Sequence, residues 1–270
     1  MVKRLRPSGI VTLTSDFGTS DSYVGAMKGV MLRLAPSLRL VDIGHQVSPQ
    51  DVIAGAAVIE NAALEFPDGT VHLVVVDPGV GTERAPIAVW SDHQVFVGPD
   101  NGVFSPFFRT DGAVARMIDR EGPLGPMLGA RSSNTFHGRD IFAPVAALLA
   151  SGMVRYQDVG PRLDPIQHSV SCPSVDEQGV IGTVVTIDHF GNCITNIRPA
   201  MLKDAIRSSR RVHLGAERDV PWLQTYGEVE RGEGLALVGS GGFLEIAVRD
   251  GSAAERFSIE RGHKVRIRRS

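Results

Sequence analysis

The sequence has few cysteines, no long apolar run and no excess of charge of either sign. Two cysteines, Cys172 and Cys193, stand among 270 residues, which is too few for a disulfide framework, and their spacing is not that of a metal site. No apolar run approaches the roughly 20 residues that cross a bilayer. The uncharged stretch from Gly9 to Ser15 is too short for the core of a signal peptide. The sequence therefore predicts a cytoplasmic protein with no membrane partner.

The charges nearly balance, with 28 Lys and Arg against 30 Asp and Glu and a formal net charge of −2. A nucleic-acid partner would favour a basic excess, so we expect none. Hydrophobic residues make up 43% and charged residues 21% of the chain, as in ordinary globular proteins. The length is sufficient for one large domain or two smaller ones.

The first part of the chain alternates short β-branched runs with longer segments of helical periodicity. Strand-like runs lie at 10–14, 38–43, 71–76, 87–90 and 95–97, and helical periodicity covers 23–34, 51–66 and 141–150. Ser48-Pro49-Gln50-Asp51 predicts a capped helix start with proline at the first helical position. Strands that alternate with helices imply parallel pairing. We expect residues 1–165 to form a Rossmann-like α/β domain with a mostly parallel sheet.

A change in composition separates this domain from the rest. Residues 152–177 carry several Pro and Gly and show little periodicity, and we expect a linker at 166–178. Beyond it, short strand-like runs follow closely at 180–187, 193–197, 211–214, 235–238, 243–248 and 264–268. Closely spaced short strands are typical of a small β-barrel or sandwich, which we expect at 179–270.

Asp77 ends an apolar strand and opens a turn, Asp77-Pro78-Gly79-Val80-Gly81, that carries Arg84 close behind it. In open α/β sheets, ligands bind at the carboxyl ends of parallel strands. A second dense segment, 135–140, contains His137. Imidazole titrates near neutral pH, a carboxylate can orient it, and guanidinium lowers the cost of forming an anion. Together the three predict a site that activates water; the alternative is a structural ion pair beside a polar histidine.

Asp16 lies where the first strand runs into a loop of hydroxyls and carboxylates. A carboxylate there can accept hydrogen bonds from both hydroxyls of a ribose, although no turn reads G-x-G-x-x-G. Asp21 or Ser22 is suited to capping the next helix. His45, at the end of another strand, is a candidate fourth member of the water-activating set, or is simply hydrogen-bonded. No H-x-x-H, H-E-x-x-H or D-x-D spacing occurs, so a metal site is the weaker hypothesis.

Two polar loops interrupt the strands of the second domain. Asp188-His189-Phe190-Gly191-Asn192 separates two strands and is equally compatible with a plain hairpin connection. Ser240-Gly241-Gly242-Phe243 has glycines that let a ligand approach the backbone closely. Neither loop has the length or the lysine of a P-loop.

Seven segments together resemble those of the S-adenosyl-L-methionine (SAM) hydroxide adenosyltransferases, relatives of the bacterial fluorinating and chlorinating enzymes that use the same substrate. The resemblance runs over nearly the whole chain, and seven segments in the right order are highly specific. They are Ser15-Asp16-Phe17-Gly18, Tyr23-Val24-Gly25, Asp42-Ile43-Gly44-His45, Val75-Val76-Asp77-Pro78-Gly79-Val80-Gly81, Pro99-Asp100-Asn101-Gly102, Phe136-His137-Gly138-Arg139-Asp140 and Asp188-His189-Phe190-Gly191-Asn192.

The resemblance implies a homotrimer whose active sites lie between the larger domain of one subunit and the smaller β domain of the next. SAM is then the substrate, with no separate cofactor, and Asp77, Arg84 and His137 match the family's water-handling triad. The implied substrate contacts are Asp16 with the ribose hydroxyls, Asp21 with the substrate amino group, Asp188 and Ser240 with the methionine portion, and Asn192, with Tyr226 nearby, at the adenine.

Two departures from the halogenating branch favour water as the nucleophile. Those enzymes carry a tyrosine where Asp77 stands and lack the His of Phe136-His137-Gly138. A buried carboxylate would repel a halide. The fluorinating type also has a long insertion where Ser91-Asp92-His93-Gln94 forms a short turn here. We therefore expect hydrolysis of SAM to adenosine and L-methionine; the alternatives are a SAM-dependent halogenase and a non-catalytic SAM-binding protein.

Overall fold

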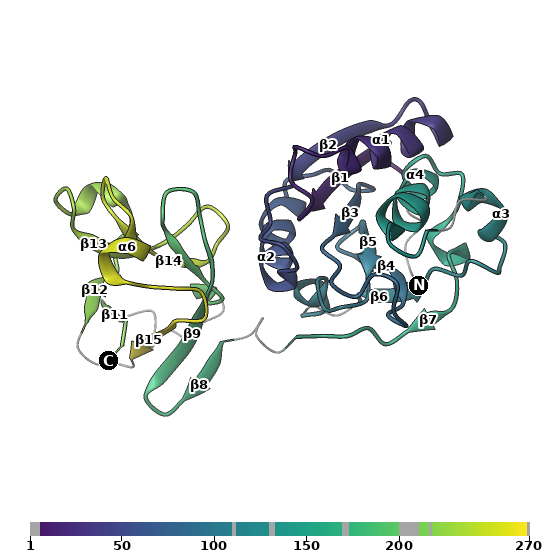
Figure 1. Cartoon of the computed structure of the whole chain (residues 1–270). Helices are drawn as coiled ribbons and strands as arrows, with labels where there is room; N and C mark the ends of the chain where they lie inside the picture. Colours follow the sequence, from purple (N-terminus) through teal and green to yellow (C-terminus); the bar gives the residue numbers. More distant parts are fainter. Residues whose placement is uncertain are drawn as a thin grey trace. The chain divides into compact units, whose positions relative to one another are not determined.

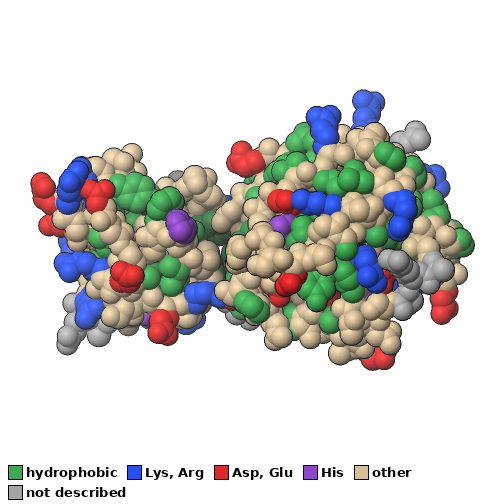
Figure 2. Space-filling view, turned by 45° about the horizontal axis from the view of Figure 1, so that its top comes forward, with side chains coloured by type: hydrophobic (Ala, Val, Ile, Leu, Met, Phe, Trp, Pro, Cys, Tyr) green, Lys and Arg blue, Asp and Glu red, His purple; other side chains and the backbone are tan. Residues whose placement is uncertain are grey.

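The computed structural model describes residues 6–109, 112–129, 133–168, 173–199, 211–215 and 218–268. The chain forms two compact units, the first ending at His168 and the second beginning at Ser169, and each has its own sheet and core (Figure 1). The fold is mixed α/β. On the face seen in Figure 2, basic and acidic side chains are interspersed over both units. No helix in the described ranges is long and apolar enough to cross a bilayer.

The first unit contains a seven-stranded sheet of order β2-β1-β3-β5-β4-β6-β7. Its strands are β1 (Ile10–Ser15), β2 (Arg39–Gly44), β3 (Val71–Val75), β4 (Pro86–Ser91), β5 (Gln94–Pro99), β6 (Val114–Met117) and β7 (Arg162–Leu163).

The sheet is only partly parallel, which corrects the prediction of a mostly parallel one. β1 pairs in parallel with β2 and β3, and β3 with β5, whereas the pairs β4–β5, β4–β6 and β6–β7 are antiparallel. The physical reason is the connection between β4 and β5. Asp92 and His93 both have positive φ, 46° and 63°, and a two-residue turn of that kind forces a hairpin.

Helices cover both faces of this sheet. On one face, α1 (Tyr23–Leu34) and α4 (Ala143–Ala150) pack into a core with alternate residues of β3, and on the other, α2 (Val52–Ala63) packs with Val74 of that strand (Figure 1). All residues of β3 are buried, as expected for a strand covered on both sides. The short helix α3 spans Gly125–Leu128.

The two predicted helix starts differ in detail from the structure. Asp51 is the N-cap of α2, and its side chain accepts a hydrogen bond from Ala54 N at 2.9 Å. Pro49 precedes the cap, so the prediction of proline at the first helical position is wrong. Ser22 occupies the N-cap of α1, but its side chain makes no capping hydrogen bond.

A buried polar chain fixes β3 between its neighbours. His72 is fully buried; its Nδ1 lies 2.7 Å from Thr12 Oγ1 of β1 and its Nε2 lies 3.1 Å from Gln94 Oε1 of β5. Burial lowers the pKa of His72 to about 4, so the ring is neutral at neutral pH. These contacts fix the register of β3, which places Val76 and Asp77, the two residues after the strand, at the carboxyl edge of the sheet.

The second unit is a nearly closed antiparallel barrel of order β12-β11-β15-β9-β10-β14-β13, with β8 paired to β9. An isolated bridge from Trp222 to Ala236 links the two ends of this order. The strands are β8 (Ser174–Asp176), β9 (Gly179–Ile187), β10 (Cys193–Thr195), β11 (Arg211–His213), β12 (Asp219–Pro221), β13 (Gly234–Val238), β14 (Leu244–Val248) and β15 (Lys264–Arg268), and α6 is Ala253–Phe257.

Part of the predicted linker is therefore strand, because β8 lies within 166–178 and pairs with β9. Of the two cysteines, Cys193 is buried without a disulfide, and burial raises the pKa of its thiol to about 11. Cys172 lies outside the described residues.

Candidate active site

The structure brings Asp77, Arg84 and His137 together at the carboxyl end of β3. Arg84 Nε lies 2.9 Å and 3.1 Å from the two carboxylate oxygens of Asp77, and Arg84 Nη2 donates a further hydrogen bond to Oδ2. The same Nη2 lies 2.7 Å from His137 Nδ1. The side chains of Asp77 and Arg84 are only 5% and 8% exposed. We call this cluster the triad.

A tight turn folds Arg84 back over Asp77. Val80 N donates to Asp77 O at 3.3 Å, and Thr82 Oγ1 donates to Gly79 O at 2.7 Å. Gly81 has φ +80°, and a Cβ there would lie 2.6 Å from the carbonyl oxygen of Asn134. Glycine is required at position 81 for both reasons.

The contacts define the protonation of His137. Arginine can only donate hydrogen bonds, so His137 Nδ1 accepts from Arg84 and the neutral ring carries its proton on Nε2. Burial, followed by the charge of Arg84, lowers the pKa of His137 below its ordinary value, although Asp77 acts in the opposite direction. His137 is therefore neutral at neutral pH.

The hydrogen bonds within the triad use Nε and Nη2 of Arg84 but not Nη1. Its Nη1 is buried and has no hydrogen-bond partner among the residues that the structure describes. The guanidinium carbon lies 5.1 Å from the centre of the Phe142 ring, which fixes the plane of the group. A buried N–H without a partner is costly, so this position is suited to a ligand that accepts a hydrogen bond.

His137 is held at the start of a π-helical turn, η2 (Gly138–Phe142). π-helical turns occur frequently at functional sites. A Cβ at Gly138 would lie 3.1 Å from Met27 Sδ of α1, so glycine allows the turn to pack closely on that helix. Arg139 Nε pairs with Asp140 Oδ1 at 2.7 Å, and Asp140 also accepts from Ser133 N.

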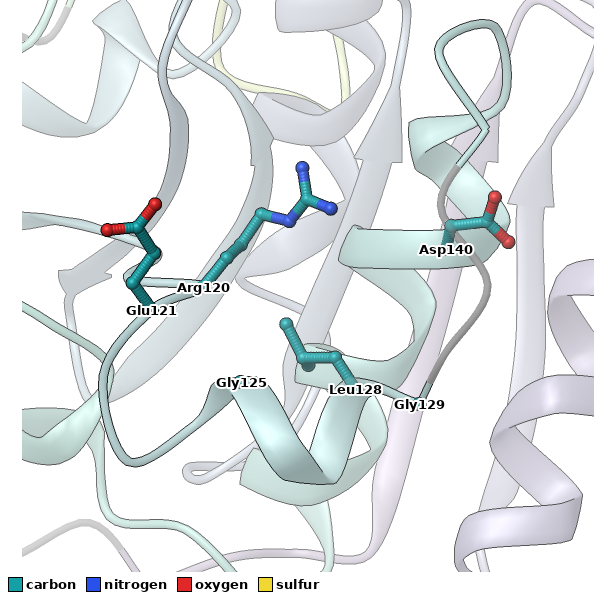
Figure 3. Close-up of a pocket in the computed structure, with 6 residues that line it drawn as sticks. All are labelled: Arg120, Glu121, Gly125, Leu128, Gly129 and Asp140. Atoms are coloured by element: carbon teal, nitrogen blue, oxygen red, sulfur yellow. The ribbon is translucent and has the colours of Figure 1, made fainter.

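A pocket of about 400 Å³ lies between the loop that carries Arg120 and the turn that carries Asp140. In Figure 3, the Arg120 guanidinium points into the space between its own loop and the helical turn that carries Asp140. The charge of Arg120 lowers the pKa of His137 and that of Asp140 raises it, so both lie within electrostatic range of the imidazole. The other lining residues are Glu121, Gly125, Leu128 and Gly129.

Asp16 lies at the end of β1 and is tied to the loop after β2. Its Oδ2 accepts a hydrogen bond from Gln50 N at 2.8 Å, and Gly18 N donates to His45 O at 2.7 Å. The His45 ring contacts Ser15 Oγ at 2.7 Å and Asp42 Oδ1 at 3.1 Å. Those partners lie on β1 and β2 and are not members of the triad, so they give no support to the hypothesis that His45 is its fourth member.

The exposed Asp21 lies in the same loop as Asp16. An aromatic cluster flanks the loop, with the ring centres of Phe17, Tyr23 and Phe136 between 5.2 and 5.9 Å apart. Phe136 immediately precedes His137, so the cluster connects the Asp16 loop with the segment that carries the triad histidine.

In the second unit, Asp188 and Asn192 form one hydrogen-bonded loop between β9 and β10. Asp188 Oδ1 accepts from the backbone N–H groups of Phe190 and Asn192, and Oδ2 accepts from Asn192 Nδ2, each at 2.9 Å. Asn192 is buried, whereas Phe190 is 74% exposed.

Tyr226 contacts Glu245, which lies within electrostatic range of Asp188. Sequence reasoning missed Glu245. The Tyr226 hydroxyl, on the short helix η6 (Tyr226–Glu228), donates to Glu245 Oε1. Glu245 is buried, and both burial and the charge of Asp188 raise the pKa of its carboxyl group. The sequence does contain a signal, since a carboxylate inside the apolar run of β14 is unusual.

Ser240 lies on an exposed loop between β13 and β14. Arg198 lies against this loop: its Nη1 is 3.4 Å from Gly241 O, and its guanidinium carbon is 3.9 Å from the centre of the Phe243 ring. Arg198 was also missed from the sequence. Within the described ranges, no group of three or more His, Cys, Asp or Glu side chains has a geometry that could hold a metal ion.

Comparisons with known proteins cover both units. A family model described as the SAM hydroxide adenosyltransferase N-terminal domain matches residues 11–160, and the model of the C-terminal domain of that family matches residues 182–266.

Among similar proteins, an (R)-S-adenosyl-L-methionine hydrolase of Salinispora arenicola (strain CNS-205) is 38% identical over 260 residues, which cover 95% of this chain and 97% of the relative. The hydrolase of the same name from Thermus thermophilus is 38% identical over 261 residues, covering 95% and 98%. A fluorinase of Actinoplanes sp. is 27% identical over 292 residues, covering 96% and 97%.

Solved structures agree with these matches. An uncharacterized conserved protein from Thermotoga maritima has a TM-score of 0.86 at 38% identity, with 95% of this chain and 99% of that chain covered. A conserved hypothetical protein from Thermus thermophilus has a TM-score of 0.76 at 36% identity, with 97% and 99% covered.

Proposed function

The chain belongs to the SAM hydroxide adenosyltransferase family, and from this premise we propose that it hydrolyses SAM to adenosine and L-methionine. Water attacks the ribose 5′ carbon in line with the sulfonium. The C5′–S bond breaks with both electrons going to sulfur, a C5′–O bond forms, and one proton is released. Methionine leaves as a neutral thioether, so its departure requires no acid.

The observation that carries this proposal is the spare donor capacity of Arg84. The buried Nη1 has no partner among the described residues and belongs to the guanidinium that contacts both Asp77 and His137. A water oxygen that accepts a hydrogen bond there lies within the triad. Positioning of this kind can supply on the order of 7 to 11 kcal/mol of the barrier reduction.

Within the triad, we assign proton acceptance to Asp77. His137 Nδ1 already accepts from Arg84, which leaves the Nε2 proton as a donor toward the nucleophile. Arg84 cannot accept a proton. The Asp77 carboxylate has lone pairs beyond those that Arg84 occupies, and it is the remaining base of the three.

The substrate contacts follow the chemistry of the two units. Asp16 accepts hydrogen bonds from the ribose hydroxyls, and the exposed Asp21 meets the amino group. Asp188 and Ser240 contact the methionine portion, while Asn192 and Tyr226 contact the adenine.

The assembly that we propose is a cytoplasmic homotrimer with active sites at the subunit interfaces and no separate cofactor, metal, nucleic-acid or membrane partner. We also propose that the first unit is Rossmann-like in its parallel half. There β1 pairs in parallel with β2 and β3, and helices pack on both faces of the sheet. Light scattering at micromolar concentration tests the trimer.

Asp77 weighs against the halogenase alternative, because its carboxylate is 5% exposed and a buried negative charge repels chloride or fluoride. The ordered triad weighs against a protein that only binds SAM, since binding alone does not need a preorganised donor and base.

The decisive experiment is to incubate the purified protein with each sulfonium epimer of SAM, with and without chelator, and to quantify adenosine and L-methionine by chromatography. We expect the two products in equal amounts, with ¹⁸O from labelled water in the adenosine 5′ hydroxyl. A parallel reaction with added fluoride or chloride tests for 5′-halo-adenosine. Tight binding of SAM without either product would overturn the hydrolase proposal.

A further inference from the structure

The turn Pro99-Asp100-Asn101-Gly102 lies at the end of β5 and has no role in the proposed chemistry. Asn101 Nδ2 donates a hydrogen bond to the carbonyl oxygen of Val76 at 2.9 Å. Val76 directly precedes Asp77, so this bond holds the peptide group from which the triad carboxylate extends. Asn101 Oδ1 accepts from Val103 N at 3.2 Å, which fixes the amide in the orientation that points its NH₂ at β3.

On its other side, this turn carries the last residues of the first unit. Ile166 N donates to Asp100 Oδ1 at 2.9 Å, His168 N donates to Ser105 Oγ at 2.8 Å, and His168 Nε2 lies 2.8 Å from Asn101 O. A carbonyl can only accept, so His168 Nε2 donates this bond. Three hydrogen bonds therefore anchor segment 166–168, although Ile166 itself is 51% exposed.

Gly102 makes the close approach of His168 feasible. Its φ is +89°, and a Cβ at this position would lie 2.2 Å from His168 Cδ2. A side chain at position 102 would therefore displace the imidazole. Asp100 is buried, and burial raises the pKa of its carboxyl group; its oxygen is committed to the backbone of segment 166–168.

We propose that Asn101 is a positioning residue for Asp77 and that the anchoring of segment 166–168 through His168 holds Asn101 in place. His168 donates to the backbone of Asn101, and the Asn101 side chain donates to Val76 O. These two hydrogen bonds connect segment 166–168 with the peptide group that joins Val76 to Asp77. The catalytic consequence rests on the proposed hydrolase function, but the chain of contacts does not.

The size of the expected effect follows from the demands of in-line attack. A misplacement of about 1 Å can cost on the order of 100-fold in rate, and neither Asn101 nor His168 is among the proposed substrate contacts. Loss of the Asn101–Val76 bond is therefore expected to lower kcat while leaving the KM for SAM unchanged.

The test uses isosteric variants of the full chain. Asn101→Asp keeps the oxygen that accepts from Val103 N but loses the donor to Val76, and we expect a fall in kcat of about 10- to 100-fold. Gln157→Glu is the control for the change from amide to carboxylate, because Gln157 is exposed on the short helical turn at 156–158 of the first unit. The control is expected to keep the wild-type kcat.

His168 provides the second arm of the test. His168→Ala removes the donor to Asn101 O and is also expected to lower kcat. His168→Gln retains a side-chain N–H and is expected to keep kcat closer to the wild-type value. Since both positions act through one chain, the double variant Asn101→Asp, His168→Ala is expected to show less than the product of the two single effects.

A readout independent of turnover separates this proposal from the proposed function. The imidazole of His137 is titrated by NMR, and its pKa responds to the position of the Asp77 charge. We expect the titration to shift in Asn101→Asp and His168→Ala and to stay at the wild-type value in Gln157→Glu. An unchanged titration with unchanged kcat in both variants overturns the positioning role. Wild-type protein that does not hydrolyse SAM overturns only the hydrolase function.

Discussion

A carboxylate site in the first unit and one in the second unit compensate negative charge in different ways. In the first unit, the carboxylate of Asp77 is compensated by Arg84, which contacts both of its oxygens. In the second unit, the hydrogen bonds that Asp188 and Glu245 accept come from backbone N–H groups, an amide and a phenol. The charge of Asp188 also raises the pKa of the Glu245 carboxyl group.

This difference indicates which part of the reaction each unit serves. A carboxylate that is paired with a guanidinium attracts a further cation less than an unpaired carboxylate does, and it can still orient a water molecule. Asp188 and Glu245 have no such partner among the residues that the structure describes, so they form a negative region there, which favours a positively charged ligand. SAM carries a sulfonium and an ammonium group, so the negative region of the second unit is suited to part of the substrate and the triad of the first unit to the nucleophile.

Asp77→Asn is expected to have the largest effect. The amide keeps the shape of the carboxylate but cannot accept a proton from water, so kcat should fall about 100- to 10,000-fold with little change in the affinity for SAM. Steady-state kinetics and calorimetric titration measure the two quantities separately. An equal loss of affinity would assign Asp77 to substrate contact.

The matched control for this variant is Asp158→Asn. Asp158 also pairs bidentately with an arginine, Arg155, but their side chains are 40% and 66% exposed. An exposed ion pair contributes little, so activity and stability should remain at the wild-type level.

Asp188→Asn tests the charged region of the second unit. Removal of this negative charge should raise the KM for SAM about 10- to 100-fold, the range expected for a hydrogen bond to a charged group, and leave kcat near the wild-type value. Asp176→Asn is the control, because Asp176 also accepts from two backbone N–H groups in a hairpin, those of Gln178 and Gly179. A fall in kcat rather than a rise in KM for Asp188→Asn contradicts the division between the units.

The pH dependence separates the units without any substitution. The pKa of His137 is lowered by burial, so kcat should stay constant through neutral pH and decline only below pH 6.5, by about tenfold per pH unit, as the protonated ring loses its bond with Arg84. The raised pKa of Glu245 should make KM increase on acidification, starting above pH 4.5. An acid limb of kcat centred at or above pH 6.5 contradicts the assignment to His137.

Sequence reasoning located the triad because each member has a local signal. Asp77 ends an apolar strand, Arg84 follows a glycine turn, and His137 stands among charged residues before a helix. The helix Tyr23–Leu34 and the strand Lys264–Arg268 were predicted at the observed bounds, since their patterns are regular and their ends are marked. Residues adjacent in the sequence determine these features, so the sequence alone could predict them.

What could not be predicted depends on partners distant in sequence. The strands β6 and β7 are four and two residues long, too short for a periodic pattern. A short turn was expected at Asp92 and His93, but neither residue is a glycine, so the positive φ of both and the antiparallel pairing of β4 with β5 were not. The link from Asn101 to Val76 joins residues 25 positions apart, and only the folded sheet brings them together.

Tyr226→Phe is expected to give the smallest effect, and it tests a single hydrogen bond of the second unit. The ring that we assign to the adenine contact remains, but the hydrogen bond to Glu245 is lost, and a single such bond changes KM by roughly fivefold. Since that bond lowers the pKa of the Glu245 carboxyl group, its removal should also move the acid rise of KM to higher pH. Tyr156→Phe, which removes a hydroxyl donating to Ala88 O in the first unit, should lower the melting temperature but leave KM and its pH profile unchanged. A Tyr226→Phe variant that instead lowers kcat would show that the second unit contributes to the chemical step.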